Sequence, residues 1–184
     1  MKWIFTIVIL GILAAVALPK FSNQQSTRVT KPTIPAVAMP YTGLVNNYSN
    51  KKSIAPFVIE TSTGSNYYVK LKDIYSNQTI IEFFIRGGEQ ISTKVPLGSY
   101  QVVYASGSQW YGYHYLFGNN TSYNKTDKSF DFKQTYNGVS GYTITLYQVS
   151  NGNLSTSQLN PNQFWKTNFI SNTEFTFNDL YSTF

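Results

Sequence analysis

The chain has no cysteine, a single histidine and few charged residues, and each scarcity removes a class of site. Without cysteine there is no disulfide, no thiolate metal site and no lipid on a lipobox cysteine. One histidine, His114, excludes a site with several histidine ligands. Lysine and arginine outnumber the acids by 14 to 8, but they are scattered singly apart from Lys51-Lys52. The sequence therefore predicts no nucleic-acid surface, which would need clustered basic side chains.

Sequence motifs of catalysis are missing as well. No serine lies in a nucleophile-elbow sequence that would form a triad with His114. Asp127 and Asp131 are four residues apart at a loop–strand junction, a pair too common to indicate acid–base chemistry. Gly87-Gly88 precedes no predicted helix, so it does not form a phosphate-binding loop. The sequence predicts a protein that is not an enzyme and uses no metal or cofactor.

What the chain has in abundance is aromatic residues, with 15 tyrosines and 13 phenylalanines among 184 residues. Its 12% of charged residues is about half the usual share. This composition favours β-structure over solvated helices, because aromatic side chains fit a pleated, half-buried surface. The length is sufficient for one domain of ordinary size with appendages.

The N-terminus has the pattern of an export signal. After Met1-Lys2, residues 3–18 carry no charge, and as a helix they would be about 24 Å long. Ala15-Val16-Ala17 is a small-x-small cleavage signature, so residues 1–18 are predicted to be a signal peptide. The alternative is a retained membrane anchor, with Trp3 at the interface. Both place the rest of the chain outside the cytoplasm, in the periplasm or on the cell surface, anchored in the inner membrane if uncleaved.

Residues 9–21, ILGILAAVALPKF, also resemble the hydrophobic stalk of type IV pilins. The resemblance implies a subunit that assembles into a surface filament. The family is processed between a small residue and Phe, and it has a glutamate at the fifth mature position. This chain departs from that pattern, since Phe5 is followed by no acidic residue before Glu60.

The region after the leader divides into two parts. Residues 19–55 are rich in Pro, Ser, Thr and Asn and show no sustained periodicity, so they are predicted to be an extended linker. Residues 56–184 carry alternating strand patterns at hairpin spacing, followed by an aromatic C-terminal segment. This part is predicted to be an all-β domain, an antiparallel sandwich of about seven to eight strands.

Local signals within this domain define several elements. Residues 67–73 alternate as a half-exposed strand, with Lys70 and Lys72 on the side opposite the core. Residues 80–85 are apolar except for Glu82, which is expected to face solvent or a sheet edge. Gly87-Gly88 predicts a two-residue hairpin turn. Asn160-Pro161 predicts the start of a short helix, with Asn160 as its N-cap.

The segment Val95–Tyr100, VPLGSY, resembles the aliphatic-Pro-x-Gly-x-Tyr turn of carboxypeptidase regulatory-like and prealbumin-like sandwiches of bacterial surface proteins. The resemblance implies a β-sandwich that stiffens a stalk, mediates adhesion or packs on a neighbouring domain. Members that crosslink themselves use a Lys, an Asn or Asp and a Glu in the core. Lys70, Asn66 and Glu82 are the residues that the resemblance nominates here.

The most aromatic stretch, residues 110–117, holds the candidate binding site. As an extended segment it would place its tyrosines on one face, as a platform for sugar rings or an extended peptide. Alternatively, the tyrosine face fills the sandwich while the tryptophan covers its rim, and the histidine is a half-buried hydrogen-bonding residue. The candidate ligand-binding residues are Trp110, Tyr111, Tyr113, His114 and Tyr115.

These patterns together predict an exported, membrane-tethered, non-catalytic β-sandwich of the cell envelope. It would act by binding or adhesion to an envelope protein or glycan, or as a structural module. A pilin-like or stalk subunit of a surface filament is the alternative, and a hydrolase is the second alternative.

Overall fold

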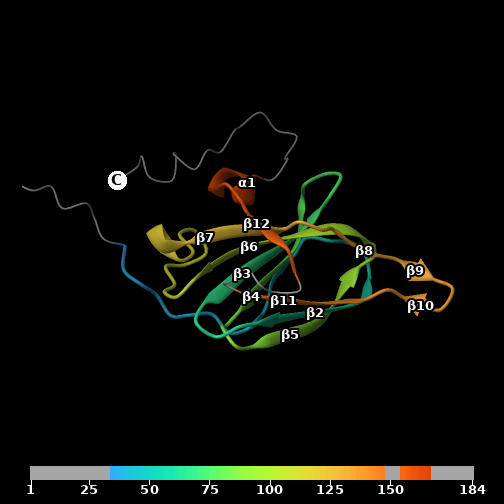
Figure 1. Cartoon of the computed structure of the whole chain (residues 1–184), viewed down its shortest axis with the longest axis horizontal. Helices are drawn as coiled ribbons and strands as arrows, with labels where there is room; N and C mark the ends of the chain where they lie inside the picture. The colour runs from blue at the N-terminus through green and yellow to red at the C-terminus, as the bar shows by residue number, and fades with distance from the viewer. Residues whose placement is uncertain (1–33, 148–153, 167–184) are drawn as a thin grey trace, which may run out of the picture. The chain divides into compact units, whose positions relative to one another are not determined.

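The computed structural model describes residues 34–147 and 154–166 (Figure 1). The predicted signal peptide or anchor, residues 1–18, lies outside the described residues, as does most of the aromatic C-terminal segment. Among the helices of the described part, none has the length and apolar character needed to cross a membrane.

The described chain is mostly β-structure with antiparallel sheets, as the sequence predicts. The larger sheet has seven strands, and β8 (Phe130–Phe132) joins it by pairing with β6. The other six are ordered β1 (Gly43–Asn47), β4 (Thr79–Ile85), β3 (Asn66–Asp73), β6 (Gly98–Gly107), β7 (Ser122–Thr126) and β12 (Thr156–Gln158).

The smaller sheet has three strands, ordered β11 (Tyr142–Leu146), β2 (Ser53–Thr61) and β5 (Gln90–Pro96). Here β11 runs parallel to β2, so that Ile144 lies opposite Ile59. Hairpin spacing in the sequence does not predict this parallel pairing, because the two strands are far apart in the chain. The remaining elements are the ribbon of β9 (Gln134–Thr135) and β10 (Gly138–Val139), the 3₁₀ turn η1 (Gly118–Asn120) and the helix α1 (Pro161–Trp165).

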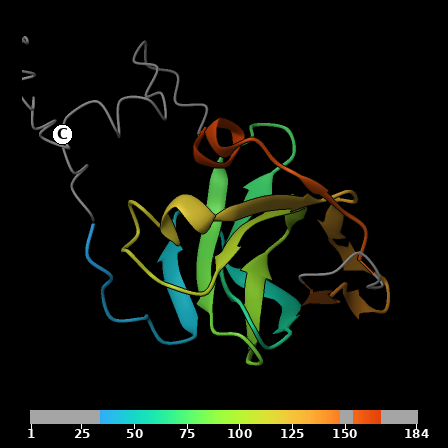
Figure 2. The same cartoon turned by 60° about the vertical axis from the view of Figure 1, so that its left-hand side comes forward.

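The two sheets face each other across a shared apolar core, which we call the inner core (Figures 1 and 2). Phe57 of β2 is fully buried there, and its ring meets the ring of Phe132 at 5.3 Å in an edge-on arrangement. Its buried members are Ala55, Phe57, Ile59, Tyr67, Val69, Leu71, Ile81, Phe83, Ile85, Val95, Tyr100, Val102, Tyr104, Phe130, Phe132, Ile144 and Leu146.

The turn at Gly87-Gly88 links the two sheets instead of closing a hairpin, so the predicted hairpin is wrong. β4 pairs with β1 and β3, whereas β5 pairs with β2. The turn chemistry itself is as expected: Gly88 has φ +81°, and a side chain at Gly87 would overlap the carbonyl oxygen of Ser65. Turn geometry is a local property, but the partner of the following strand is not.

The VPLGSY segment makes a second connection between the sheets. The Tyr100 hydroxyl donates a hydrogen bond to the Leu97 carbonyl at 3.1 Å. A Cβ at Gly98 would lie 2.5 Å from the Tyr100 hydroxyl oxygen, so the ring can close over this position only because residue 98 is glycine. The tyrosine therefore fixes the bend that takes the chain from β5 to β6.

β1 lies within residues 19–55, the range for which the sequence predicts an extended linker. It pairs antiparallel with β4, with a register shift between Leu44 and Asn46. The chain entering β1 is held by Arg86, whose Nε donates to the Pro40 carbonyl at 2.8 Å and whose Nη2 donates to the Met39 carbonyl at 3.0 Å. These are contacts with a residue 46 and 47 positions away in the chain, which the composition of the segment does not reveal.

The outer face of the larger sheet is also covered. Figure 2 shows α1, in red, lying over the strands. Together with the loop 108–117, it buries a second group of side chains that we call the outer-face cluster. Its members are Tyr68, Phe84, Val103, Ala105, Trp110, Leu116, Phe117, Tyr123, Leu159 and Phe164. Lys70 and Lys72 are buried on this face, so the prediction of a half-exposed strand for residues 67–73 is wrong.

Candidate functional site

The centre of the outer face is a buried ion pair. β3 and β4 are antiparallel neighbours whose register sets Lys70 opposite Glu82. The Lys70 ammonium lies 3.3 Å from Glu82 Oε1, and the two side chains are only 6% and 7% exposed. Glu82 was expected to face solvent or an edge. It is buried instead, because the face that carries it is covered.

The second carboxylate oxygen of Glu82 is bound from the neighbouring edge strand. Asn46 Nδ2 donates to Oε2 at 2.7 Å, and the Tyr48 hydroxyl donates to the same oxygen at 2.9 Å. Burial by itself raises the pKa of Glu82, but the bond from Asn46, the charge of Lys70 and the bond from Tyr48 together lower it below its ordinary value. Asn46, Glu82 and Lys70 thus form a polar row across three adjacent strands.

Aromatic rings surround the other side of the Lys70 ammonium. It lies 4.6 Å from the ring centroids of Phe164 and Trp165, and 5.8 Å from that of Tyr68. Ring faces attract a cation electrostatically, and the attraction grows when water is excluded. Burial nevertheless lowers the pKa of Lys70, and the nearby Glu82 carboxylate offsets only part of this effect. Because Phe164 and Trp165 belong to α1, these contacts of Lys70 link the sheet to the helix.

Lys72 makes a second link to the same helix. Its ammonium donates to the carbonyl of Gln163 at 3.0 Å and to that of Lys166 at 2.8 Å. These carbonyls lie at the C-terminal end of α1, where free acceptors and the helix dipole favour a cation. Burial and the charge of Lys70 lower the pKa of Lys72 to about 8.

The site is suited to holding surfaces together. The Glu82 carboxylate is bound by Lys70, Asn46 and Tyr48, and the Lys72 ammonium by two main-chain carbonyls. A buried charge that is paired and hydrogen-bonded fixes the arrangement of its partners. Among the residues that the structure describes, no three potential ligand side chains gather to hold a metal ion.

Only part of this site was indicated by the sequence. Of the residues nominated for a crosslink, the structure pairs Lys70 with Glu82, but Asn66 is four residues from Lys70 along β3, about 13 Å away in an extended strand. Asn66 Oδ1 accepts instead from the Gly87 amide at 3.2 Å. The signal that was missed is two opposite charges on the outward side of consecutive strands joined by a short turn.

The predicted aromatic segment is folded differently from the expectation. Residues 113–117 form turns rather than an extended strand, with φ +94° at Gly112 and +48° at Leu116. Trp110 is buried in the outer-face cluster, where its ring lies 4.9 Å from that of Phe84. Tyr113 packs edge-on against Trp110 at 5.2 Å and remains half exposed.

The other candidates of this segment are half-buried, except His114. The Tyr111 hydroxyl donates to Gln109 Oε1 at 3.0 Å. His114 is exposed, not half-buried as predicted, and its ring contacts that of Tyr115 at 4.8 Å. The structure therefore pairs the ring of Tyr113 with that of Trp110 and the ring of His114 with that of Tyr115.

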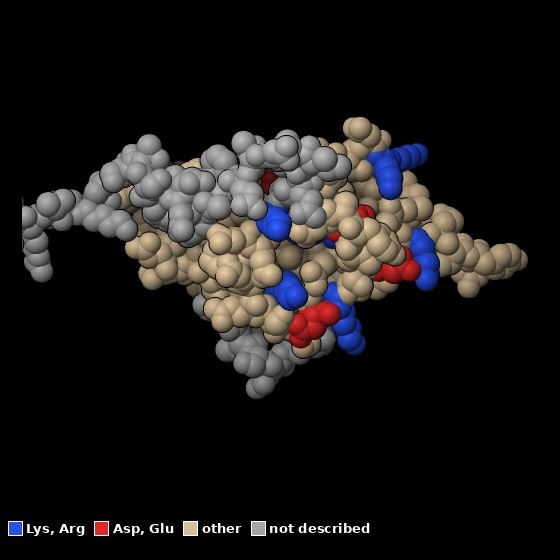
Figure 3. Space-filling model, turned by 90° about the horizontal axis from the view of Figure 1, so that it is seen from above, with Lys and Arg blue, Asp and Glu red and all other residues tan. Residues whose placement is uncertain are grey.

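Exposed tyrosines occur mainly outside this segment. Tyr41 and Tyr75 are each 85% exposed, and Tyr136 is fully exposed. Tyr75 lies in the turn between β3 and β4, and Tyr136 lies in the turn between β9 and β10. On the face seen in Figure 3, basic and acidic side chains are interspersed, without a basic stripe.

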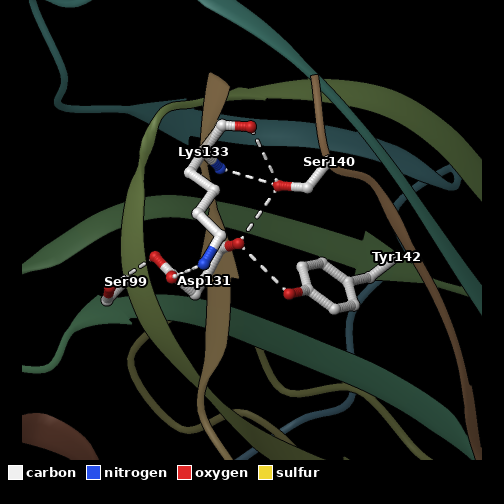
Figure 4. A network of polar contacts seen from close by, with 5 residues as sticks. All are labelled: Ser99, Asp131, Lys133, Ser140 and Tyr142. Carbon is white, nitrogen blue, oxygen red and sulfur yellow. Dashed lines mark hydrogen bonds and ion pairs between the residues drawn. The ribbon is translucent and has the colours of Figure 1, made fainter. Parts of the chain in front are cut away.

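A second polar network holds the β9–β10 ribbon to the body (Figure 4). The Asp131 carboxylate accepts from the Ser99 hydroxyl at 2.9 Å and pairs with Lys133 at 3.1 Å. The main-chain carbonyl of Asp131 accepts hydrogen bonds from the hydroxyls of Ser140 and Tyr142, each at 3.1 Å. Asp131 and Lys133 are well exposed, so this network positions the ribbon that carries Tyr136 and does not form a second buried site.

Comparison of the chain with protein-family models, with curated proteins and with solved structures gave no match.

Proposed function

We propose that the chain is an exported, membrane-tethered and non-catalytic β-sandwich module of the cell envelope, which acts by binding or adhesion through its exposed tyrosines. One feature supports the export part of the proposal, the apolar segment 3–18 with its cleavage signature. The role itself is argued from the surface of the domain.

The observation that carries the proposal is the exposure of tyrosine at the tips of hydrogen-bonded turns. Tyr75 and Tyr136 stand on turns whose bases are fixed by polar contacts. Asp73 Oδ1 accepts from the amides of Tyr75 and Ser76, and the network of Asp131 holds the base of the other turn. Tyrosine offers a large amphipathic contact area at low entropic cost, and rigid presentation lowers the cost of binding further.

The test is co-sedimentation of the full chain with isolated peptidoglycan sacculi and, separately, with envelope membrane vesicles. We expect the wild-type chain to sediment with one of them and the Tyr75→Ser, Tyr136→Ser variant to lose at least tenfold in affinity. Tyr147→Ser is the matched control, since Tyr147 is also exposed but follows a strand. Equal binding by the double variant and the wild type, with unchanged melting temperatures, would refute the proposal.

The tether is tested separately from the ligand. Fractionation of expressing cells followed by N-terminal sequencing distinguishes a chain cut after Ala17 from one retained in the membrane. We expect the protein outside the cytoplasm in both cases. Recovery of the intact chain from the cytosol would overturn the export proposal and leave the binding measurement untouched.

A second candidate, a stalk or filament subunit, is favoured by the edge at β1, beyond which no other described strand is paired. This strand is an end member of the larger sheet and contains no charged residue and no proline. In contrast, β5, at one edge of the smaller sheet, carries Lys94 and Pro96, residue types that discourage further strand pairing. Filaments in electron micrographs of the purified chain, lost on substitution of the exposed Leu44→Lys, would support this candidate over a monomeric module.

A further inference from the structure

Residues 154–166 differ from the rest of the described chain in how they are attached, and we call them the latch. They comprise β12 and α1 and lie at the far edge of the larger sheet. β12 pairs only with β7 among the described strands, in the register Ser157 opposite Lys125. Because no described strand lies beyond β12 in the sheet order, removing the latch would leave the order from β1 to β7 intact.

The helix of the latch is too short to be stable alone. α1 has five residues, and isolated helices below about twelve residues are marginal in water. Its start is well formed, since Asn160 accepts from the Asn162 amide at 2.9 Å and Gln163 completes a capping box. Its end is fixed from outside, by the Lys72 ammonium on the carbonyls of Gln163 and Lys166. The helical conformation of the latch therefore depends on its contacts with the sheet.

The contacts that hold the latch form a small recognition site. Phe164 is fully buried, with its ring 5.2 Å from that of Tyr123 and 6.3 Å from that of Tyr68. Lys70 lies under its ring, and Lys72 binds the end of the helix. On the strand side, the Leu159 amide donates to the Tyr123 carbonyl at 2.9 Å. The site thus binds an added strand, one phenylalanine and a helix C-terminus, and strand addition at a sheet edge is a known mode of peptide recognition.

We propose that the outer face of the larger sheet is a peptide-binding surface, that the latch leaves it as a unit while the remaining strands of both sheets stay folded, and that the latch of a second copy can replace it. The second copy is the occupant to which the geometry points, because its residues 154–166 carry the same strand, the same Phe164 and the same helix end. Exchange of an identical element between copies adds no new kind of contact. This proposal is independent of the proposed envelope role, since its readouts use only the purified chain.

The opening is tested by hydrogen exchange on the full chain, followed by mass spectrometry. We expect the amides of Phe164 and Lys166 to exchange at least tenfold faster than those of β3, with little dependence on low urea concentrations. Lys72→Met is expected to speed exchange in the latch further and leave β3 unchanged, and Lys94→Met on exposed β5 is the matched control. Equal rates and equal urea dependence for the latch and β3 would overturn the proposal.

The replacement by a second copy is tested with cysteines, which the natural chain lacks. Chains carrying Lys125→Cys are mixed with chains carrying Ser157→Cys and oxidised, since these two positions face each other in the β7–β12 register. We expect a mixed disulfide dimer well above the level given by Lys125→Cys mixed with Ser92→Cys, a position on the smaller sheet. The same yield in both mixtures would refute exchange between copies.

Discussion

The inner core and the outer face bury similar numbers of aromatic rings but are closed in different ways. The inner core lies between two sheets, and Phe57 is enclosed by paired strands on both sides. The outer face has one sheet beneath it, and within residues 34–147 and 154–166 its cover is a loop and a five-residue helix. Side chains that are equally buried in the two regions are therefore not equally protected from transient exposure to solvent. Opening the outer face breaks far fewer backbone hydrogen bonds than separating the two sheets.

The two regions also differ in what they bury. The inner core is built of apolar and aromatic side chains, whereas the outer face includes Lys70, Lys72 and Glu82. Burying charges carries a desolvation penalty of several kcal/mol per ion, which pairing repays only when geometry and hydrogen bonds are good. The outer face is thus specific in its partners, while the inner core supplies most of the stability through burial of apolar area.

The largest expected effect is the removal of a ring from the inner core. Phe57→Ala should lower the free energy of unfolding by about 3–5 kcal/mol, the range for a fully buried phenylalanine that leaves a cavity. Phe164→Ala, the matched change on the outer face, should cost only about 1–2 kcal/mol globally, because the loss cannot exceed the free energy that closes the latch. Urea unfolding of both variants measures this, and equal losses would erase the distinction between the two regions.

The next effect comes from breaking the buried ion pair. Lys70→Met should lower the free energy of unfolding by about 3 kcal/mol, because it leaves the Glu82 carboxylate buried with only its neutral partners. Lys70→Met combined with Glu82→Leu should recover most of that loss, as seen when buried pairs are replaced by apolar residues. Chemical unfolding of the single and double variants completes the cycle, with Lys94→Met as an exposed control. A double variant that is no better than the single one would contradict this account.

A smaller effect is the dependence of stability on pH, which arises from titratable groups on the outer face. The folded pKa of Lys72 is about 8, below its ordinary 10.5, so between these values the unfolded chain binds more protons and the stability rises with pH. We expect Lys72 to contribute a gain of about 1 kcal/mol between pH 7 and pH 9, which Lys72→Met should remove. Above pH 10 the trend reverses, because burial raises the pKa of Tyr68 and Tyr48, the latter to about 12, and the unfolded chain ionises first. Urea midpoints measured across this range would show a flat profile if the outer face were open in solution.

The smallest expected effect concerns the bend that joins the two sheets. Tyr100→Phe removes the hydrogen bond to the Leu97 carbonyl and keeps the ring in place, so it should cost about 1 kcal/mol. Tyr142→Phe is a matched change, since its hydroxyl also donates to a carbonyl at 3.1 Å but in an exposed network. Thermal unfolding should show a clear shift for the first variant and a smaller one for the second. The reverse order would indicate that the bend is held by its glycine and proline alone.

Local predictions from the sequence succeeded where the signal and the structure are both local. The helix capped by Asn160 begins at Pro161 as expected, and Gly88 adopts the positive φ that its turn required. Alternation in residues 67–73 identified β3 and its inward side, with Tyr67, Val69 and Leu71 in the inner core. The extended arrangement predicted for residues 110–117 failed, because regular aromatic spacing does not show that Gly112 and Leu116 reverse the chain.

The sequence by itself determined that the chain is mostly β, where several of its strands and turns lie, and which side of β3 is apolar, because period-two alternation and turn residues act over a few positions. Only the tertiary structure decided which sheet each strand joins and that Lys70, Lys72 and Glu82 are buried. The physical reason is distance along the chain. The carbonyls that bind the Lys72 ammonium belong to Gln163 and Lys166, which lie 91 and 94 positions further along the chain. The residues around a lysine in the sequence cannot indicate that such a distant segment will bury it.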